Sequence, residues 1–130
     1  MAAELLARGM GASPGRATGE MVFRGEDAVA RAAQGKAVVL VRIETTPDDV
    51  PGMTAAAGIV TTRGGITGDA AIVARSLGKP CIASCSQLHV DYVAGTLTVL
   101  RSSTDGDEDR ILRTGDAITI DGATGEIWAG

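Results

Sequence analysis

Apolar residues recur along the chain in short runs that are typical of strands separated by helices. Residues 37–43, AVVLVRI, are apolar at nearly every position, which predicts a strand buried on both faces of a sheet. Shorter strand-like runs lie at 18–23, 58–62 and 79–84. Strands and helices are therefore expected to alternate through the middle of the chain.

The clearest helix signal lies at residues 47–57. Thr46 is a good N-cap, Pro47 suits the first helical position, and the two aspartates that follow favour the positive end of the helix dipole. Pro51 comes early enough to cost a hydrogen bond or distort the first turn. Two further helices are expected at 26–34 and at 70–77, the second closed by Gly78.

The C-terminal third is rich in strand-like segments. They lie at 96–100, 117–121 and 126–128, and the acidic stretch 101–116 between the first two reads as a solvated hairpin tip. No internal repeat and no interdomain linker is visible. The pattern predicts one mixed β/α domain, built in layers and spanning residues 1–130.

Composition narrows the classes of function. The chain has 130 residues, of which 45% are hydrophobic, with a single Trp, Tyr and Phe, so aliphatic side chains must fill the core. The formal charge is −4 and no Lys/Arg cluster appears, which argues against nucleic acid as a partner. No apolar run approaches the roughly 18–20 residues that span a bilayer, so no membrane association is expected.

The N-terminus and the cysteines indicate the compartment. The first ten residues are too short and too charged for a secretory signal. Cys81 and Cys85 form no CxxC pair, and Cys81 is expected to be a small core residue. A cytoplasmic protein without a metal site or a bound cofactor is the expectation.

Residues 61–82, TTRGGITGDAAIVARSLGKPCI, carry a family resemblance. They are similar to the signature T-x-R-G-G-[MI]-T-S-H-A-A-[IV]-x-[AS]-R of the mobile central domain in pyruvate phosphate dikinase and phosphoenolpyruvate synthase. The blocks at 12–23, 44–61 and 115–130 also resemble that domain, in the same order. The resemblance therefore covers nearly the whole chain.

The resemblance implies a fold and an activity. The fold is an α/β swivelling domain with β/β/α layers. In the family this domain shuttles phosphate on a histidine between an ATP-grasp domain and a phosphoenolpyruvate-binding barrel. Neither of those domains fits in 130 residues, so the chain is expected to be a stand-alone copy of the carrier.

The chain departs from the family at the phosphorylated residue. Aligning 63–67 with the motif places Gly68 on the family's serine and Asp69 on its histidine. The sole histidine, His89, lies twenty residues further on and is expected to be partly exposed near a strand. Asp69 is the candidate catalytic residue. Its alternative role is a capping carboxylate at the start of the helix, where the dipole favours the ionised form.

The remaining candidate residues surround Asp69. Arg63 and Arg75 match positions near the family's phosphate, and either would bind an anion or pair with a nearby acid. Thr67 matches a regulatory phosphorylation site of plant dikinases and would otherwise cap the helix. The backbone amides and apolar walls of the expected ligand pocket come from Gly64, Gly65, Ile66, Gly68 and Met53.

Three hypotheses for function follow. The first is a cofactor-free enzyme that performs a cyclisation, lyase or proton-transfer step on a small metabolite, with Asp69 in the vacated pocket. The second is a non-catalytic module that docks to a dikinase or synthase-type protein partner. The third is a residual phosphocarrier that works in trans, through an acyl phosphate on Asp69.

Overall fold

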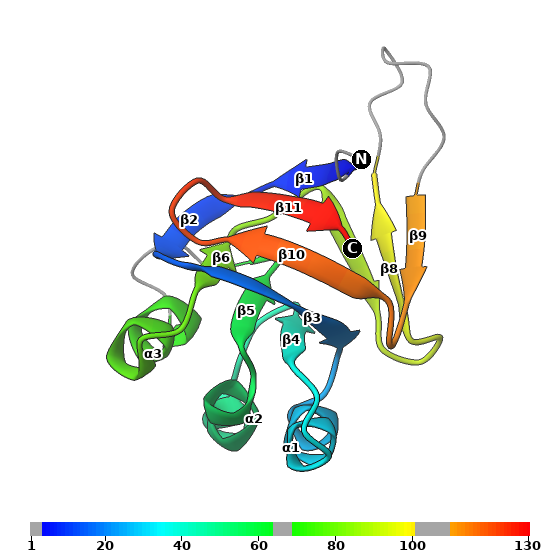
Figure 1. Ribbon diagram of the computed structural model, residues 1–130. Helices are drawn as coiled ribbons and strands as arrows, with labels where there is room; N and C mark the ends of the chain where they lie inside the picture. Colours follow the sequence, from blue (N-terminus) through cyan, green and yellow to red (C-terminus); the bar gives the residue numbers. More distant parts are fainter. Residues whose placement is uncertain (1–3, 64–68, 101–109) are drawn as a thin grey trace.

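A central sheet of eight strands organises the molecule (Figure 1). The computed structural model describes residues 4–63, 69–100 and 110–130. The order across the sheet is β1 (Leu5–Arg8), β11 (Glu126–Ala129), β10 (Ala117–Asp121), β3 (Arg16–Val22), β4 (Val38–Arg42), β5 (Gly58–Thr61), β6 (Cys81–Ala83) and β2 (Met10–Ser13). Strands β3 to β6 run parallel, and the other neighbours pair antiparallel.

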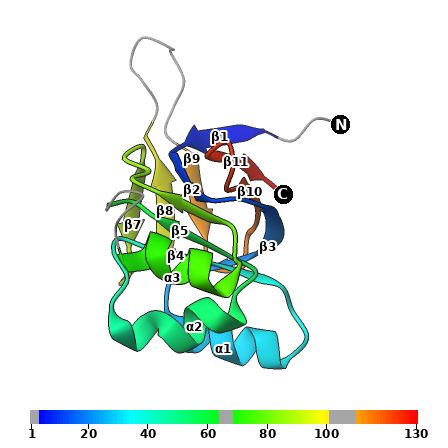
Figure 2. The ribbon, with the colours of Figure 1, turned by 90° about the vertical axis from the view of Figure 1, so that its left-hand side faces the viewer.

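Different layers cover the two faces of this sheet. The helices α1 (Gly25–Ala33), α2 (Val50–Ala55) and α3 (Asp69–Leu77) lie side by side on one face (Figure 1). A three-stranded antiparallel sheet of β7 (Leu88–Asp91), β8 (Thr96–Val99) and β9 (Arg110–Arg113) packs on the other face. Figure 2 shows the helices at one side of the central strands and the small sheet at the other. This is the expected β/β/α fold.

Two apolar cores result from the alternation of side chains along the parallel strands. In β4, Val39 and Val41 face the small sheet, whereas Val38 and Leu40 face the helices. All four are fully buried, so the prediction of a strand covered on both faces is confirmed. The helix-side core is filled mainly by small side chains, because alanines of α1 and α3 meet the sheet there.

The helix expected at 47–57 is divided in two. A 3₁₀ turn, η1 (Pro47–Asp49), comes first, and α2 then begins with Pro51 in its first turn. The backbone N–H of Thr46 donates to the Asp49 carboxylate at 2.8 Å, which closes the start of the turn. Proline cannot donate the backbone bond that a continuous helix would need, and this accounts for the break.

Four short strands were not predicted from the sequence. Strands β1 and β2 lie in a segment without alternation, and β9 lies within the stretch read as an acidic hairpin tip. In β9 only Leu112 is buried, so no hydrophobic pattern marks it. Strand β7 buries Leu88 and Val90 on one face and exposes His89 on the other. Residues 101–109 of the expected tip lie outside the described residues.

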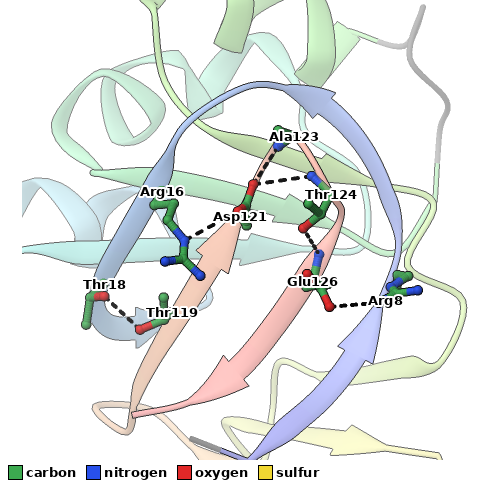
Figure 3. Close-up of polar contacts among 8 residues, drawn as sticks. All are labelled: Arg8, Arg16, Thr18, Thr119, Asp121, Ala123, Thr124 and Glu126. Carbon is green, nitrogen blue, oxygen red and sulfur yellow. Dashed lines mark hydrogen bonds and ion pairs between the residues drawn. The ribbon is translucent and has the colours of Figure 1, made fainter. Parts of the chain in front are cut away.

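The turn between β10 and β11 carries a polar cluster at the amino ends of the parallel strands (Figure 3). The carboxylate of Asp121 accepts the backbone N–H groups of Ala123 and Thr124 at 2.9 and 3.2 Å. It also lies 3.3 Å from the guanidinium of Arg16. The turn is therefore fixed by its own side chain and by strand β3. No helix in the described part of the chain is long and apolar enough to cross a membrane.

Candidate functional site

The carboxyl ends of β4, β5 and β6 meet at one edge of the central sheet because these strands are parallel. Hydrogen bonds continue past the strand ends. The N–H groups of Thr62 and Arg63 donate to the carbonyls of Arg42 and Ile43, both at 3.1 Å, and the Cys85 N–H donates to Thr61 at 3.1 Å. Loops at the carboxyl edge of a parallel sheet commonly bind ligands, so this edge is the candidate site.

A first hollow lies on the helix side of this edge. It has a volume of about 350 Å³ and a mainly apolar wall. Val50 and Ile72 remain 37% and 54% exposed at its rim, whereas Met53 is buried. The lining residues are Thr45, Thr46, Pro47, Val50, Met53, Ile72 and Val73. The hollow therefore lies beside the first turn of α3, the helix that begins at Asp69.

A second hollow lies between the end of β5 and the small sheet, with a volume of about 310 Å³. A guanidinium, an imidazole and two hydroxyl groups line it together with aliphatic side chains. Its lining residues are Ile43, Thr62, Arg63, Ser86, Leu88, His89 and Val90. Among the described residues, Arg63 brings a positive charge and His89 an imidazole to this lining, whereas neither kind of group lines the first hollow, so the two hollows differ in both polarity and charge.

Arg42, the last residue of β4, lies at the centre of a half-buried network of polar contacts near the two hollows. Its Nη1 donates to the Phe23 carbonyl at 2.9 Å, and its Nε lies 3.4 Å from Asp49 Oδ2. The guanidinium also stacks over Tyr92, 4.6 Å from the ring centroid. The contact to Asp49 is an ion pair, since Nε has no hydrogen-bond partner among the described residues.

The same network holds the backbone of both hollows. The Tyr92 hydroxyl accepts the N–H of Ile43 at 2.6 Å, and Ile43 lines the second hollow. Asp49, which Arg42 neutralises, accepts the N–H of Thr46, and Thr46 lines the first. The half-buried guanidinium of Arg42 therefore links the end of β4 to the helix layer and to the small sheet.

Three of the candidate residues have side chains that the structure describes. Met53 lines the first hollow, whereas Arg63 lines the second. Arg75 is exposed on α3, and its Nε donates to the Ala71 carbonyl of the same helix at 3.2 Å. Gly64, Gly65, Ile66, Thr67 and Gly68 lie outside the described residues, as does the side chain of Asp69. The described side chains of Met53, Arg63 and Arg75 therefore lie in different places, and the pocket expected around residues 64–69 stays a prediction.

Sequence reasoning missed most of the residues that line the hollows. One signal in the sequence could have found Ile72: it is an apolar residue that does not belong to the set of helix positions expected to face the core. In α3 the alanines at 70, 71 and 74 face the core, and Ile72 does not. Ser86, which lines the second hollow, gave no such signal, because its place depends on how the small sheet packs.

The cysteines are unsuited to nucleophilic chemistry. Cys81 and Cys85 are free and fully buried. Burial raises the pKa of each thiol to about 12, so the thiolate is scarce at neutral pH. Among the residues that the structure describes, no three His, Cys, Asp or Glu side chains gather as a metal site requires.

The sequence of the chain matches a known protein family. Residues 34–125 match the family model described as "PEP-utilising enzyme, mobile domain". The chain is 46% identical over 127 residues to pyruvate, phosphate dikinase of Rhizobium meliloti (strain 1021), covering 98% of this chain and 13% of that protein. It is 47% identical over 127 residues to the chloroplastic pyruvate, phosphate dikinase 1 of Arabidopsis thaliana, covering 98% of this chain and 12% of that protein.

Among solved structures, the chain is similar to the NMR solution structure of Enzyme I (nEIt) at a TM-score of 0.46. The identity is 24%, and the match covers 72% of this chain and 31% of that one. Compared with the two dikinases above, the chain spans only about an eighth of their length.

Proposed function

Since this chain belongs to the family of mobile domains of PEP-utilising enzymes, we propose that it is a member that binds a small metabolite in place of carrying phosphate on a histidine. The observation that carries the proposal is the apolar hollow of about 350 Å³ beside the first turn of α3. Its size is within the range of small-molecule sites.

The residue at the acceptor position supports a change of chemistry. Phosphotransfer through histidine needs a neutral imidazole nitrogen as the nucleophile, and the family motif aligns Asp69 with that position. His89 lies on β7, where it lines the second hollow, and therefore cannot replace the missing imidazole at the start of α3. A carboxylate at a helix start is held in its ionised form by the dipole and the free N–H groups.

The hollow suits a ligand with an apolar face. Met53, Ile72 and Val73 provide the wall, and Thr45 and Thr46 bring polar groups to one side. An ionised Asp69 at the adjacent helix start would accept a proton or a hydrogen bond from such a ligand. A cyclisation, an elimination or a proton transfer fits these groups, because each can proceed by orientation and proton movement without a cofactor.

A binding screen with a blocked hollow tests the proposal. Thermal-shift or ligand-observed NMR screening of metabolites should give ligands that bind the wild type and not Ile72→Trp, whose indole fills the hollow. Val29→Trp is the matched control, since Val29 is also exposed on a helix but does not line this hollow. If every ligand binds Ile72→Trp as well as the wild type, the proposal is wrong.

Asp69→Asn then tests the role of the carboxylate. Any turnover of the bound metabolite should fall about 10²–10⁴-fold, whereas the melting temperature should change little because asparagine also caps a helix. Intact-mass spectrometry after incubation with a dikinase and phosphoenolpyruvate or ATP should show no phosphoryl adduct. A stable adduct within residues 64–71 would instead support a residual phosphocarrier.

A docking module is the second candidate, because the rim of the first hollow leaves Val50 and Ile72 exposed. The chain matches only about an eighth of each dikinase, so a protein of that kind is the partner to test. Calorimetry with a pyruvate phosphate dikinase separates the candidates. Protein binding that Ile72→Glu abolishes, with no small ligand found, would favour docking.

A further inference from the structure

We propose that the second hollow is a binding site for a small anion, a phosphate or carboxylate group held by Arg63 and His89. The proposal does not depend on what occupies the first hollow. It starts from the composition of the lining, which brings one guanidinium, one imidazole and the hydroxyls of Thr62 and Ser86 around a space of about 310 Å³. Every one of these groups can donate a hydrogen bond to an anion.

The charge balance around Arg63 favours an external anion. Its side chain is exposed and forms no ion pair with any carboxylate whose side chain the structure describes. By contrast, Arg42 on the neighbouring strand is neutralised by Asp49. A planar guanidinium without an internal partner is well suited to bind a phosphate or carboxylate in a bidentate manner.

The backbone that carries Arg63 is fixed from both sides. Its N–H donates to the Ile43 carbonyl at 3.1 Å, and its carbonyl accepts the Thr61 hydroxyl at 2.9 Å. Ile43 is in turn held by the Tyr92 hydroxyl at 2.6 Å. The guanidinium is therefore presented from an ordered backbone, which lowers the entropic cost of binding.

The opposite wall begins with a strained turn. Ser84 has a φ of 52°, and within the described residues no other non-glycine residue has a positive φ. The Cys85 N–H bonds to Thr61 and the Ser86 N–H bonds to Ser84, at 3.1 and 2.9 Å. This turn redirects the chain from β6 into β7 and brings Ser86 and His89 to the hollow. Strain of this kind is often retained where it positions a binding group.

The floor of the hollow strengthens the electrostatic attraction. Leu88 and Val90 are buried, and Ile43 packs against the same core, so water is excluded from that side. Attraction between an anion and Arg63 is larger beside apolar groups than in bulk water. The hollow is open on its other side, which allows a phosphate or carboxylate attached to a larger molecule to enter.

The sole histidine of the chain makes the test direct, because its ring signals need no assignment. Wild-type protein would be titrated with inorganic phosphate, and separately with acetate, at constant pH and ionic strength, while ¹H–¹³C spectra record the His89 ring. We expect a saturable shift. The anion with the lower midpoint concentration shows whether the site prefers a phosphate or a carboxylate.

Variants decide whether the shift reports this site. Arg63→Gln should weaken binding about tenfold or more, and Arg63→Lys should weaken it less. Arg113→Gln is the matched control, since Arg113 is exposed on β9 and lines no described hollow, and it should bind as the wild type. Because His89→Gln lacks the imidazole that reports binding, its binding of phosphate is measured from the linewidth of the phosphate signal in ³¹P spectra. A non-saturable shift, or equal binding by Arg63→Gln, would overturn the proposal.

Discussion

The two ends of the parallel strands differ in how closely the chain packs. At the amino end, the turn between β10 and β11 lies directly on the β1–β2 segment. A Cβ atom on Gly122 would lie 1.8 Å from the Ser13 carbonyl oxygen, and one on Gly125 would lie 2.1 Å from the Gly9 carbonyl oxygen. At the carboxyl end, two open hollows of about 350 and 310 Å³ separate the loops.

The difference suggests that the amino end of the sheet contributes to stability and the carboxyl end to binding. At the amino end backbone touches backbone, and side chains such as Asp121 tie the turn to β3 (Figure 3). Substitutions there must move main chain, which is costly. At the carboxyl end the exposed side chains of Val50, Ile72, Arg63 and His89 contribute little to the core. Changes at those positions should alter binding while the fold persists.

The largest effect is expected at the amino end. Gly122→Ala places a methyl group where the Ser13 carbonyl lies, so the β10–β11 turn and β2 must separate. The free energy of unfolding should fall by about 3 kcal/mol or more, measured by urea denaturation. Gly25→Ala is the control, because its nearest contact is an ordinary 3.5 Å and it lies in a helix. Equal stabilities of the two variants would show that the amino end is not tightly packed.

A smaller loss of stability is expected where the carboxyl end is anchored. Arg42→Met removes the cation from the half-buried network and leaves the Asp49 carboxylate without its partner. The free energy of unfolding should decrease by about 2–3 kcal/mol. Asp49→Asn should cost less, since asparagine can still accept the Thr46 N–H. A double-mutant cycle by urea denaturation measures the coupling, and additive effects would contradict the network.

The sequence predicted the strands and helices around the parallel core because their signals are local. Residues 37–43 are continuously apolar, and Thr46, Pro47 and Gly78 mark helix ends. Short strands such as β9 bury a single side chain, and their pairing is set by partners distant in the sequence. Local patterns therefore could not reveal them.

The candidate site could be predicted only in part. The motif at 61–82 begins at the carboxyl end of β5, and two of the predicted residues, Met53 and Arg63, line hollows at that edge of the sheet. The sequence could not reveal that these two residues line different hollows. That division results from the small sheet, whose strand β7 contributes three residues to the second hollow. Arg75 lies on α3, where its Nε donates to the Ala71 carbonyl of the same helix, and it is in neither lining.

Ile72→Ser tests whether the carboxyl end serves binding, because the substitution should weaken ligand binding more than it lowers the free energy of unfolding. Ile72 is 54% exposed, so removing its side chain should change the free energy of unfolding by less than about 1 kcal/mol. Binding to the first hollow, whether of a small ligand or of a partner protein, should weaken about tenfold through lost apolar contact. Parallel melting and titration experiments measure both. A large loss of stability would show that the rim belongs to the core.

The smallest effect concerns the polar surface of the amino end and depends on pH. The Arg8 guanidinium donates to Glu126 at 2.7 Å, and this hydrogen bond, helped by Thr124, holds the pKa of Glu126 below its usual value of 4.5 (Figure 3). A carboxyl group whose pKa is lower in the folded state stabilises the protein above the unfolded pKa, and this stabilisation disappears as the pH falls through the folded pKa.

Wild type should therefore be slightly more stable than Glu126→Gln near pH 7, and the difference should vanish below the folded pKa of Glu126. The difference should also shrink in high salt, because both partners lie at the surface. Urea denaturation of the two proteins across this pH range measures it, with Glu44→Gln as the exposed control. A stability difference that persists unchanged at low pH would show that Glu126 acts through packing. The close contacts of Gly122 and Gly125 would then account for the stability of the amino end without a contribution from charge.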